Sequence, residues 1–310
     1  MDMFGISSIF CFLIGTLLNI ISCAYFCSRK RSHKPITLIY SQISVTDTVI
    51  CALSLAPMVS YILAGKAGLF GADLPCTLWD ILMEVSVRYS LFLVAVLSVC
   101  RTRAIISPLQ LLSKRKIGLI VGGYLLFLCL QETLPAIALQ RAAIYVPQRL
   151  SCHFFWLEST FTPFQTMVFK IFTFFGEIGI PMAVGGVTGA LCIYSLTEKK
   201  HRQDNCVTEV QELKKREATK TIVIVTGACL LLNLPIVSIA IIFIVRVPMS
   251  AETILMAVDL ASSLVVLNSL FNSLIYFVRI KRMRRFAKRL ILSCICGQIV
   301  QNEIQDGINI

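Results

Sequence analysis

Two groups of charged residues lie inside long apolar stretches of the chain, where a charge without a partner is costly. Asp80, Glu84 and Arg88 follow one another at intervals of four residues, so they share one face of a helix. Lys170 and Glu177 share a face of a later stretch. These five side chains predict a hydrated pocket for a polar or zwitterionic small molecule, or for the end of a short peptide. A structural cluster of salt bridges would use the same residues and stays open as an alternative.

A second polar set surrounds one deeply placed carboxylate. Asp47 lies in the stretch ISVTDTVI, and Asn19, Ser90, Asn268 and Asn272 lie at comparable depth in other apolar stretches. Carboxylate, amide and hydroxyl oxygens are ligands that suit a small hard cation such as sodium. The alternative is a neutral, hydrogen-bonded aspartate that only holds helices together, and the residue types alone do not separate the two.

Seven apolar runs must position these groups, and each is long enough to cross a hydrocarbon layer about 30 Å thick as a helix of about 20 residues. The chain of 310 residues is 56% hydrophobic and only 15% charged, and its mean hydropathy is +0.80. We therefore expect an all-α membrane protein, with one domain over residues 1–297 and a short cytoplasmic tail over 298–310. The expected spans are Phe4–Cys27, Thr37–Leu63, Leu78–Cys100, Ile117–Leu139, Phe164–Tyr194, Thr221–Val245 and Ile254–Val278.

The net charge of +12 indicates orientation rather than nucleic-acid binding. If the first run passes from outside to inside, most lysine and arginine residues fall in inner segments, which places the carboxyl end in the cytoplasm. They also favour contact with anionic lipids. The charged stretch Val210–Ala218 lacks proline and glycine, so it should extend the sixth helix into the cytoplasm.

The segments between the runs supply no catalytic arrangement. The chain contains no GxSxG, HExxH, P-loop or CxxC motif, and His33, His153 and His201 lie in connections on both sides of the membrane. Glu132 and Asp259, near outer ends of their runs, either border the pocket or lie at the interface. We therefore expect a binding protein rather than an enzyme, with no cofactor beyond a possible allosteric sodium ion.

Four cysteines outside the runs suggest covalent modification. Cys76 and Cys152 lie in outer segments, where oxidising conditions allow them to pair. The segment Arg279–Leu292 places apolar residues on one side of a basic helix, as in an amphipathic helix that lies on the membrane. Cys294 and Cys296 follow it and suit S-palmitoylation; two unmodified thiols are the alternative.

The order of several short motifs resembles the rhodopsin-like (class A) G protein-coupled receptors over roughly residues 5–297. Gly15–Asn19 is similar to the family's GN motif, Asp47 to its second-helix aspartate, and Arg101–Leu109 to DRYxAIxxPL. Cys76 and Arg101 are separated by about 37 Å of helix, as expected for the third helix of the family. Further matches are Leu69–Gly71, the prolines Pro181 and Pro235, and Asn272–Tyr276, which resembles NPxxY.

The resemblance assigns roles to these positions. It implies a Cys76–Cys152 disulfide and a sodium pocket made by Asp47, Ser90, Asn268 and Asn272. It implies that Arg101 contacts a heterotrimeric G protein, that the sixth helix pivots at Pro235, and that Tyr276 belongs to the inner switch. Asn233 stands where the family usually has an aromatic toggle residue.

Other departures concern the resting state and the ligand. Cys100 replaces the acidic residue before Arg101, Thr102 replaces the usual tyrosine, and Lys215 stands where an acid would hold the arginine. Because nothing obvious holds Arg101, we expect raised basal activity. Met83 occupies the position of the amine-binding aspartate, which argues against a typical biogenic-amine receptor.

The resemblance implies a plasma-membrane receptor with its amino terminus outside, which couples an extracellular ligand to a G protein. A seven-helix transporter or channel that uses the buried charges as a relay is the first alternative, although neither paired half-repeats nor broken helices are visible. A decoy receptor without G-protein output is the second, because of the altered residues around Arg101.

Overall fold

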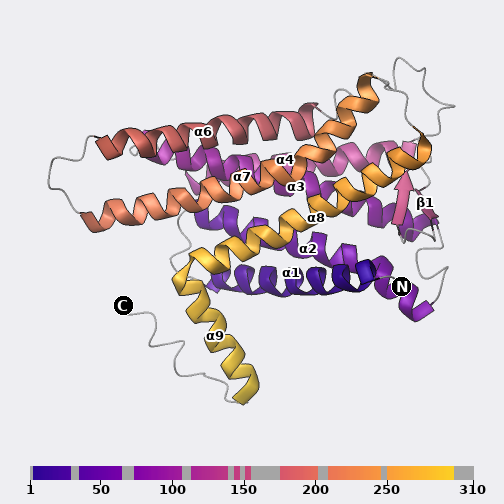
Figure 1. Cartoon of the computed structure of the whole chain (residues 1–310), viewed down its shortest axis with the longest axis horizontal. Coiled ribbons are helices and arrows are strands. Elements are labelled where there is room, and N and C mark those ends of the chain that lie inside the picture. The colour runs from indigo at the N-terminus through magenta and orange to yellow at the C-terminus, as the bar shows by residue number, and fades with distance from the viewer. Residues whose placement is uncertain are drawn as a thin grey trace.

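The structure is a computed structural model that describes residues 3–28, 35–64, 73–106, 113–138, 143–146, 151–154, 175–201, 209–245 and 250–296. Long helices make up nearly all of this part (Figure 1). In chain order the elements are α1 (Met3–Ser28), α2 (Pro35–Ala64), α3 (Asp73–Ile106), α4 (Lys114–Ala138), β1 (Ala143–Val146), β2 (Ser151–Phe154), the π-helical turn η2 (Phe175–Gly179), α6 (Ile180–His201), α7 (Glu209–Val245), α8 (Ala251–Arg279) and α9 (Lys281–Cys296).

The helices form a bundle around α3. Helix α3 contacts α2, α4, α6 and α7, and α8 closes the bundle against α1, α2 and α7. The side chains of Leu93 and Leu97 on α3 are completely buried, whereas Leu231 on α7 and Leu119 on α4 are 72% and 68% exposed. Apolar residues therefore cover the outer surface as well as the core, which suits a protein whose outer surface contacts lipid rather than water.

The number of crossings agrees with the sequence prediction. In the described part of the chain, six helices are long and apolar enough to cross a membrane, and the bent pair α8 and α9 raises the number to as many as seven. Figure 1 places the start of α1 and strand β1 at the same end of the bundle and α9 at the other. Helix α7 begins at Glu209, which confirms the predicted extension of the sixth helix.

Proline residues lie in two of the spans near the functional groups. Pro57 in α2 has no N–H, so it cannot bond the carbonyl of Leu53 four residues earlier. The indole Nε1 of Trp79 on α3 donates a hydrogen bond of 2.7 Å to that carbonyl oxygen, which replaces the missing bond and joins the two helices. In the fifth span, Pro181 follows the π-helical turn that carries Glu177.

The chain turns by 98° between α8 and α9. Ile280 leaves the helical conformation there, with φ −96° and ψ 94°, while its N–H still bonds the Tyr276 carbonyl. Met283 and Ala287 of α9 are fully buried, and the ring of Phe286 lies 5.7 Å from that of Tyr25 on α1. The amphipathic helix predicted over Arg279–Leu292 is therefore present and is longer than expected. The side chains of Cys294 and Cys296, and all of residues 297–310, lie outside the described part.

A short hairpin covers the end of α3 that carries Cys76. Strands β1 and β2 pair in antiparallel register, with Tyr145 opposite Cys152, and both strands contact α3. Cys76 is buried and disulfide-bonded. The side chain of Cys152 lies outside the described part, so its pairing with Cys76 stays a prediction.

Candidate functional site

Arg88 of α3 is the centre of a buried ion-pair cluster. Its Nη2 lies 2.8 Å from an oxygen of Glu84, one turn away on the same helix. Its Nη1 lies 2.5 Å from an oxygen of Glu132 on α4 and also pairs with Glu177 on η2. We call Glu84, Arg88, Glu132 and Glu177 the Arg88 cluster. It joins three spans, and the sequence pattern predicted three of its four members as ligand-binding residues.

The other predicted pocket residues are less well placed. Asp80 lies on α3 two turns before Arg88 and is half-buried. Lys170 and the side chain of Asp259 lie outside the described part of the chain. Glu132, which the sequence placed only at the border of the pocket, is a direct partner of Arg88. Nothing in the sequence of α4 shows which way this carboxylate points, so its role was missed.

The members of the Arg88 cluster differ in how deeply their side chains are buried. The side chains of Glu84, Arg88, Glu132 and Glu177 are 47%, 13%, 8% and 3% exposed. Apart from its ion pair with Arg88, the Glu177 carboxylate has no hydrogen-bond partner in the described part of the chain. Three carboxyl groups, from α3, α4 and η2, share the one guanidinium of Arg88.

Asp47 on α2 is held by two other helices. The hydroxyl of Ser90 on α3 donates to Oδ1 over 2.7 Å, and the amide nitrogen of Asn272 on α8 donates to Oδ2 over 3.0 Å. Asp47 and Asn272 are completely buried. Nearby, the amide nitrogen of Asn19 on α1 donates to the carbonyl of Ser269 over 3.1 Å. The predicted set is therefore gathered between α1, α2, α3 and α8.

The residues around Asp47 fit a sodium ion. The side-chain oxygens of Asn19, Asn268 and Asn272 are buried and have no hydrogen-bond partner among the described residues. The assignment of amide oxygen and nitrogen follows from the hydrogen bonds that the nitrogens make. Oxygen acceptors without donors, beside a carboxylate, are the ligands that a hard cation prefers.

Near the carboxyl end of α3, Arg101 has a partner on the sixth span. Its Nε donates to the hydroxyl of Thr219 on α7 over 3.0 Å, and Thr219 is 1% exposed. The expectation that nothing holds Arg101 is therefore wrong. A neutral hydroxyl on α7 makes the contact that an acidic side chain was expected to make.

Thr102, which follows Arg101, joins α3 to α6. Its hydroxyl donates to the carbonyl of Ser98 on its own helix, and it is also within 3.1 Å of the Thr188 carbonyl on α6. The hydroxyl of Thr188 donates in turn to that of Ser98 over 2.7 Å. A small residue in place of the usual tyrosine thus builds a local polar contact between two spans.

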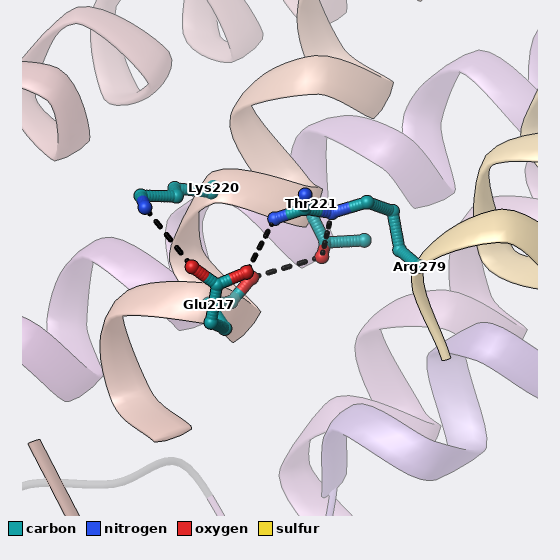
Figure 2. Close-up of polar contacts among 4 residues, drawn as sticks. All are labelled: Glu217, Lys220, Thr221 and Arg279. Carbon is teal, nitrogen blue, oxygen red and sulfur yellow. Dashed lines mark hydrogen bonds and ion pairs between the residues drawn. The ribbon is translucent and has the colours of Figure 1, made fainter. Parts of the chain in front are cut away.

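A second polar contact joins the amino-terminal part of α7 to the carboxyl end of α8 (Figure 2). Nη2 of Arg279 on α8 lies 2.7 Å from Glu217 on α7, and its Nε donates to the Thr221 hydroxyl over 3.5 Å. The Thr221 hydroxyl donates to the backbone carbonyl of Glu217, and Lys220 pairs with the other carboxylate oxygen at 2.9 Å. We call Glu217, Lys220, Thr221 and Arg279 the Glu217 clasp. The Lys220 ammonium, together with Arg279, holds the pKa of Glu217 below its usual value.

Two of the predicted switch residues, Tyr276 and Asn233, are buried within the bundle. Tyr276 is fully buried, and its ring centre lies 5.0 Å from that of Tyr40 on α2. Asn233 is 4% exposed, and its amide nitrogen donates to the carbonyl of Cys229, one turn back on α7. Pro235 lies inside α7, two residues further on. Asn233 is thus bound to its own helix.

Comparison with known families gives a match that covers most of the chain. Residues 18–276 match the family described as 7 transmembrane receptor (rhodopsin family). No curated protein sequence matches the chain. The matched range begins in α1 and ends at Tyr276 in α8, so it includes the Arg88 cluster, Asp47 and Arg101.

Proposed function

Because the chain belongs to the rhodopsin family of seven-transmembrane receptors, we propose that it couples a polar extracellular ligand, bound at the Arg88 cluster, to a heterotrimeric G protein at the inner end of the bundle. Family membership makes it a multi-pass signalling receptor and not an enzyme. The ligand site, the orientation and the residues that carry the signal are the proposal.

The observation that carries the ligand site is the ion-pair network of Arg88. Carboxylates from α3, α4 and η2 converge on one guanidinium, and the outermost of them, Glu84, is 47% exposed. An exposed carboxylate facing lipid would be costly, so we infer that Glu84 opens to a hydrated cavity. A ligand in that cavity would contact three spans at once.

The contacts at the inner end would hold the bundle in a resting state, and a bound ligand would shift the equilibrium away from that state. The Arg101–Thr219 bond joins α3 to α7, and the Glu217 clasp joins α7 to α8. Outward movement of the inner part of α7 about Pro235 would break both contacts and open the face around Arg101. A ligand favours that state only through its higher affinity for it.

Further assignments belong to the same proposal. A sodium ion at Asp47 would stabilise the resting bundle, because its ligands come from separate helices. A Cys76–Cys152 disulfide would fix the hairpin to the outer end of α3, which it contacts. The amino terminus would lie outside the plasma membrane, and α9 would lie on the cytoplasmic lipid surface with Cys294 and Cys296 lipidated.

The test is G-protein dissociation in cells that express the wild type or Arg101→Ala at equal surface density. We expect basal and ligand-evoked dissociation in the wild type and loss of both in the variant. Arg101→Lys is the matched control that keeps a positive charge, and it should retain part of the signal. Ligand binding without dissociation by the wild type would indicate a decoy receptor. Solute uptake by the purified protein in liposomes would indicate a transporter.

A further inference from the structure

The outer surface of α1 ends in two cysteines whose thiol groups lie side by side. Cys23 and Cys27 are one helical turn apart, and their sulfur atoms are 3.9 Å from each other. Cys23 is partly exposed and Cys27 is exposed. We propose that Cys27 is S-acylated with a long-chain fatty acid, at a site separate from Cys294 and Cys296. This inference goes beyond the proposed function, and it rests on the proposed orientation, which places the carboxyl end of α1 in the cytoplasm.

The position of Cys27 along α1 matches the depth at which cells attach fatty acids to membrane proteins. Helix α1 ends at Ser28, so Cys27 belongs to the last turn of the span. The sequence continues with Arg29, Lys30 and Arg31, whose charges favour the anionic cytoplasmic leaflet. Cysteines beside the cytoplasmic surface of a membrane are the ones that undergo S-palmitoylation. The Cys27 thiol is therefore exposed at the place where this reaction occurs.

Contacts between α1 and α9 give an independent indication of this depth. The ring of Tyr25 lies 5.7 Å from that of Phe286, and the Ser22 hydroxyl lies 4.0 Å from the sulfur of Met283. Figure 1 shows α9 at the end of the bundle where α1 finishes. Because an amphipathic helix of this kind lies on the membrane surface, the last turn of α1 lies at the same surface.

Exposure and position together distinguish Cys27 from the other free cysteines that the structure describes. Within that group, Cys27 and Cys129 are the exposed residues, and the others are buried or partly buried. Cys129 lies on α4, about 22 Å along the helix from Lys114 at its start. Its thiol is therefore deep in the hydrocarbon layer, whereas that of Cys27 is at the edge, within reach of an acyl donor from the cytoplasm.

An exposed apolar stripe on α1 provides a path for the acyl chain. Leu13, Leu17 and Ile20 are exposed and lie on the same face of the helix as Cys27. Side chains on a helix lean toward its amino terminus, and the short distance between the two sulfur atoms shows that the Cys27 side chain lies against the preceding turn. An acyl chain on this sulfur runs along the stripe into the hydrocarbon layer, where its methylene groups are buried.

The reaction exchanges one thioester for another. The Cys27 sulfur attacks the carbonyl carbon of a long-chain acyl-coenzyme A, supplied by the cell together with a membrane-bound acyltransferase. A carbon–sulfur bond forms to Cys27, and the bond between the acyl carbon and the sulfur of coenzyme A breaks. The proton of the Cys27 thiol passes to the released coenzyme A thiolate. No oxidant or reductant takes part, so the reaction is compatible with the reducing cytoplasm.

The experiment counts the thioesters on the full-length receptor expressed in cells. Free thiols are blocked, hydroxylamine cleaves the thioesters, and each released thiol then receives a maleimide polymer that adds a fixed mass. The substitutions Cys294→Ser and Cys296→Ser first remove the acyl sites proposed for α9. We expect this background to keep a hydroxylamine-dependent mass step, and the further substitution Cys27→Ser to remove one step. An unchanged number of steps after Cys27→Ser would overturn the inference.

Two matched variants test the choice of residue. Cys129→Ser removes the other exposed thiol of the described part of the chain and should leave the mass step in place. Cys23→Ser should leave it in place as well, and loss of the step in Cys23→Ser but not in Cys27→Ser would refute the assignment to Cys27. Mass spectrometry of the wild-type peptide that contains Cys27 locates the acyl group without any substitution, so the result does not depend on how well a variant folds.

Labelling of an unmodified Cys27 separates this inference from the proposed function. If the thiol reacts with a membrane-impermeant maleimide only after the cells are permeabilised, the inference fails and the proposed orientation and receptor function stand. If it reacts on intact cells, the end of α1 is outside, which counts against both. Acylation of Cys27 in a chain that causes no G-protein dissociation would support the modification site and count against the receptor mechanism.

Discussion

Replacing Thr219 by valine should raise the basal activity of the receptor. Thr219 is 1% exposed, and its hydroxyl accepts the 3.0 Å hydrogen bond from Arg101. Valine has nearly the same shape, so Thr219→Val removes the acceptor and leaves the packing of α7 almost unchanged. If this contact belongs to the resting state only, the substitution destabilises that state relative to the active one.

The size of the effect follows from the chemistry of the bond. A hydrogen bond to a charged group contributes about 1.5–3 kcal/mol, and the half-buried position of Arg101 favours the lower end of that range. About 1.4 kcal/mol changes an equilibrium constant tenfold. A receptor with about 1% of its molecules active at rest would then have about 10% active.

The assay is ligand-free G-protein dissociation, measured against surface expression for each variant. Thr219→Ser keeps the hydroxyl and loses one methyl group, so it should remain close to the wild type. Equal basal activity of Thr219→Val and the wild type would refute the idea that this bond restrains α3 and α7. An increase of the same size in Thr219→Ser would show that packing, and not the hydrogen bond, is responsible.

Three other experiments test other parts of the structure. Arg279→Gln should raise basal activity by releasing α7 from α8, and in a double-mutant cycle Glu217→Gln should add little to this increase. Because the pKa of Glu217 is lowered, the Glu217 clasp should stay charged at cytoplasmic pH. Its contribution to the resting state should be lost only as the pH falls through that lowered pKa. Asp47→Asn should abolish the difference in basal G-protein dissociation between sodium chloride and choline chloride, whereas the wild type should be less active in sodium. Trp79→Phe should lower the melting temperature, because the Leu53 carbonyl loses its donor at a cost of about 1–3 kcal/mol; an unchanged melting temperature would argue that water replaces the indole.

The helices could be predicted because a membrane span requires a long apolar run, and such runs are read directly from the sequence. The amphipathic helix α9 could be predicted equally well, since its buried residues Met283 and Ala287 repeat at helical spacing. Ion pairs within one helix could be predicted too, because Glu84 and Arg88 are four residues apart and their contact follows from helix geometry.

Contacts between distant parts of the chain were harder to predict. The sequence gives no direct sign that Glu132 points at Arg88, or that Arg279 reaches Glu217, because these pairs depend on how the helices are rotated and crossed. The Arg101–Thr219 bond was missed for a chemical reason as well, since a search for an acidic partner overlooks a hydroxyl. The polar set around Asp47 was found because polar groups are rare in apolar runs.

The hydrogen bond that turns Asn233 back onto the carbonyl of Cys229 affects how this receptor would sense its agonist. In place of a bulky ring that a bound molecule could push aside, α7 presents a compact amide already engaged with its own backbone. Displacement of a ring at this position therefore cannot be the trigger, and a bound molecule would have to shift α7 through contacts with other side chains.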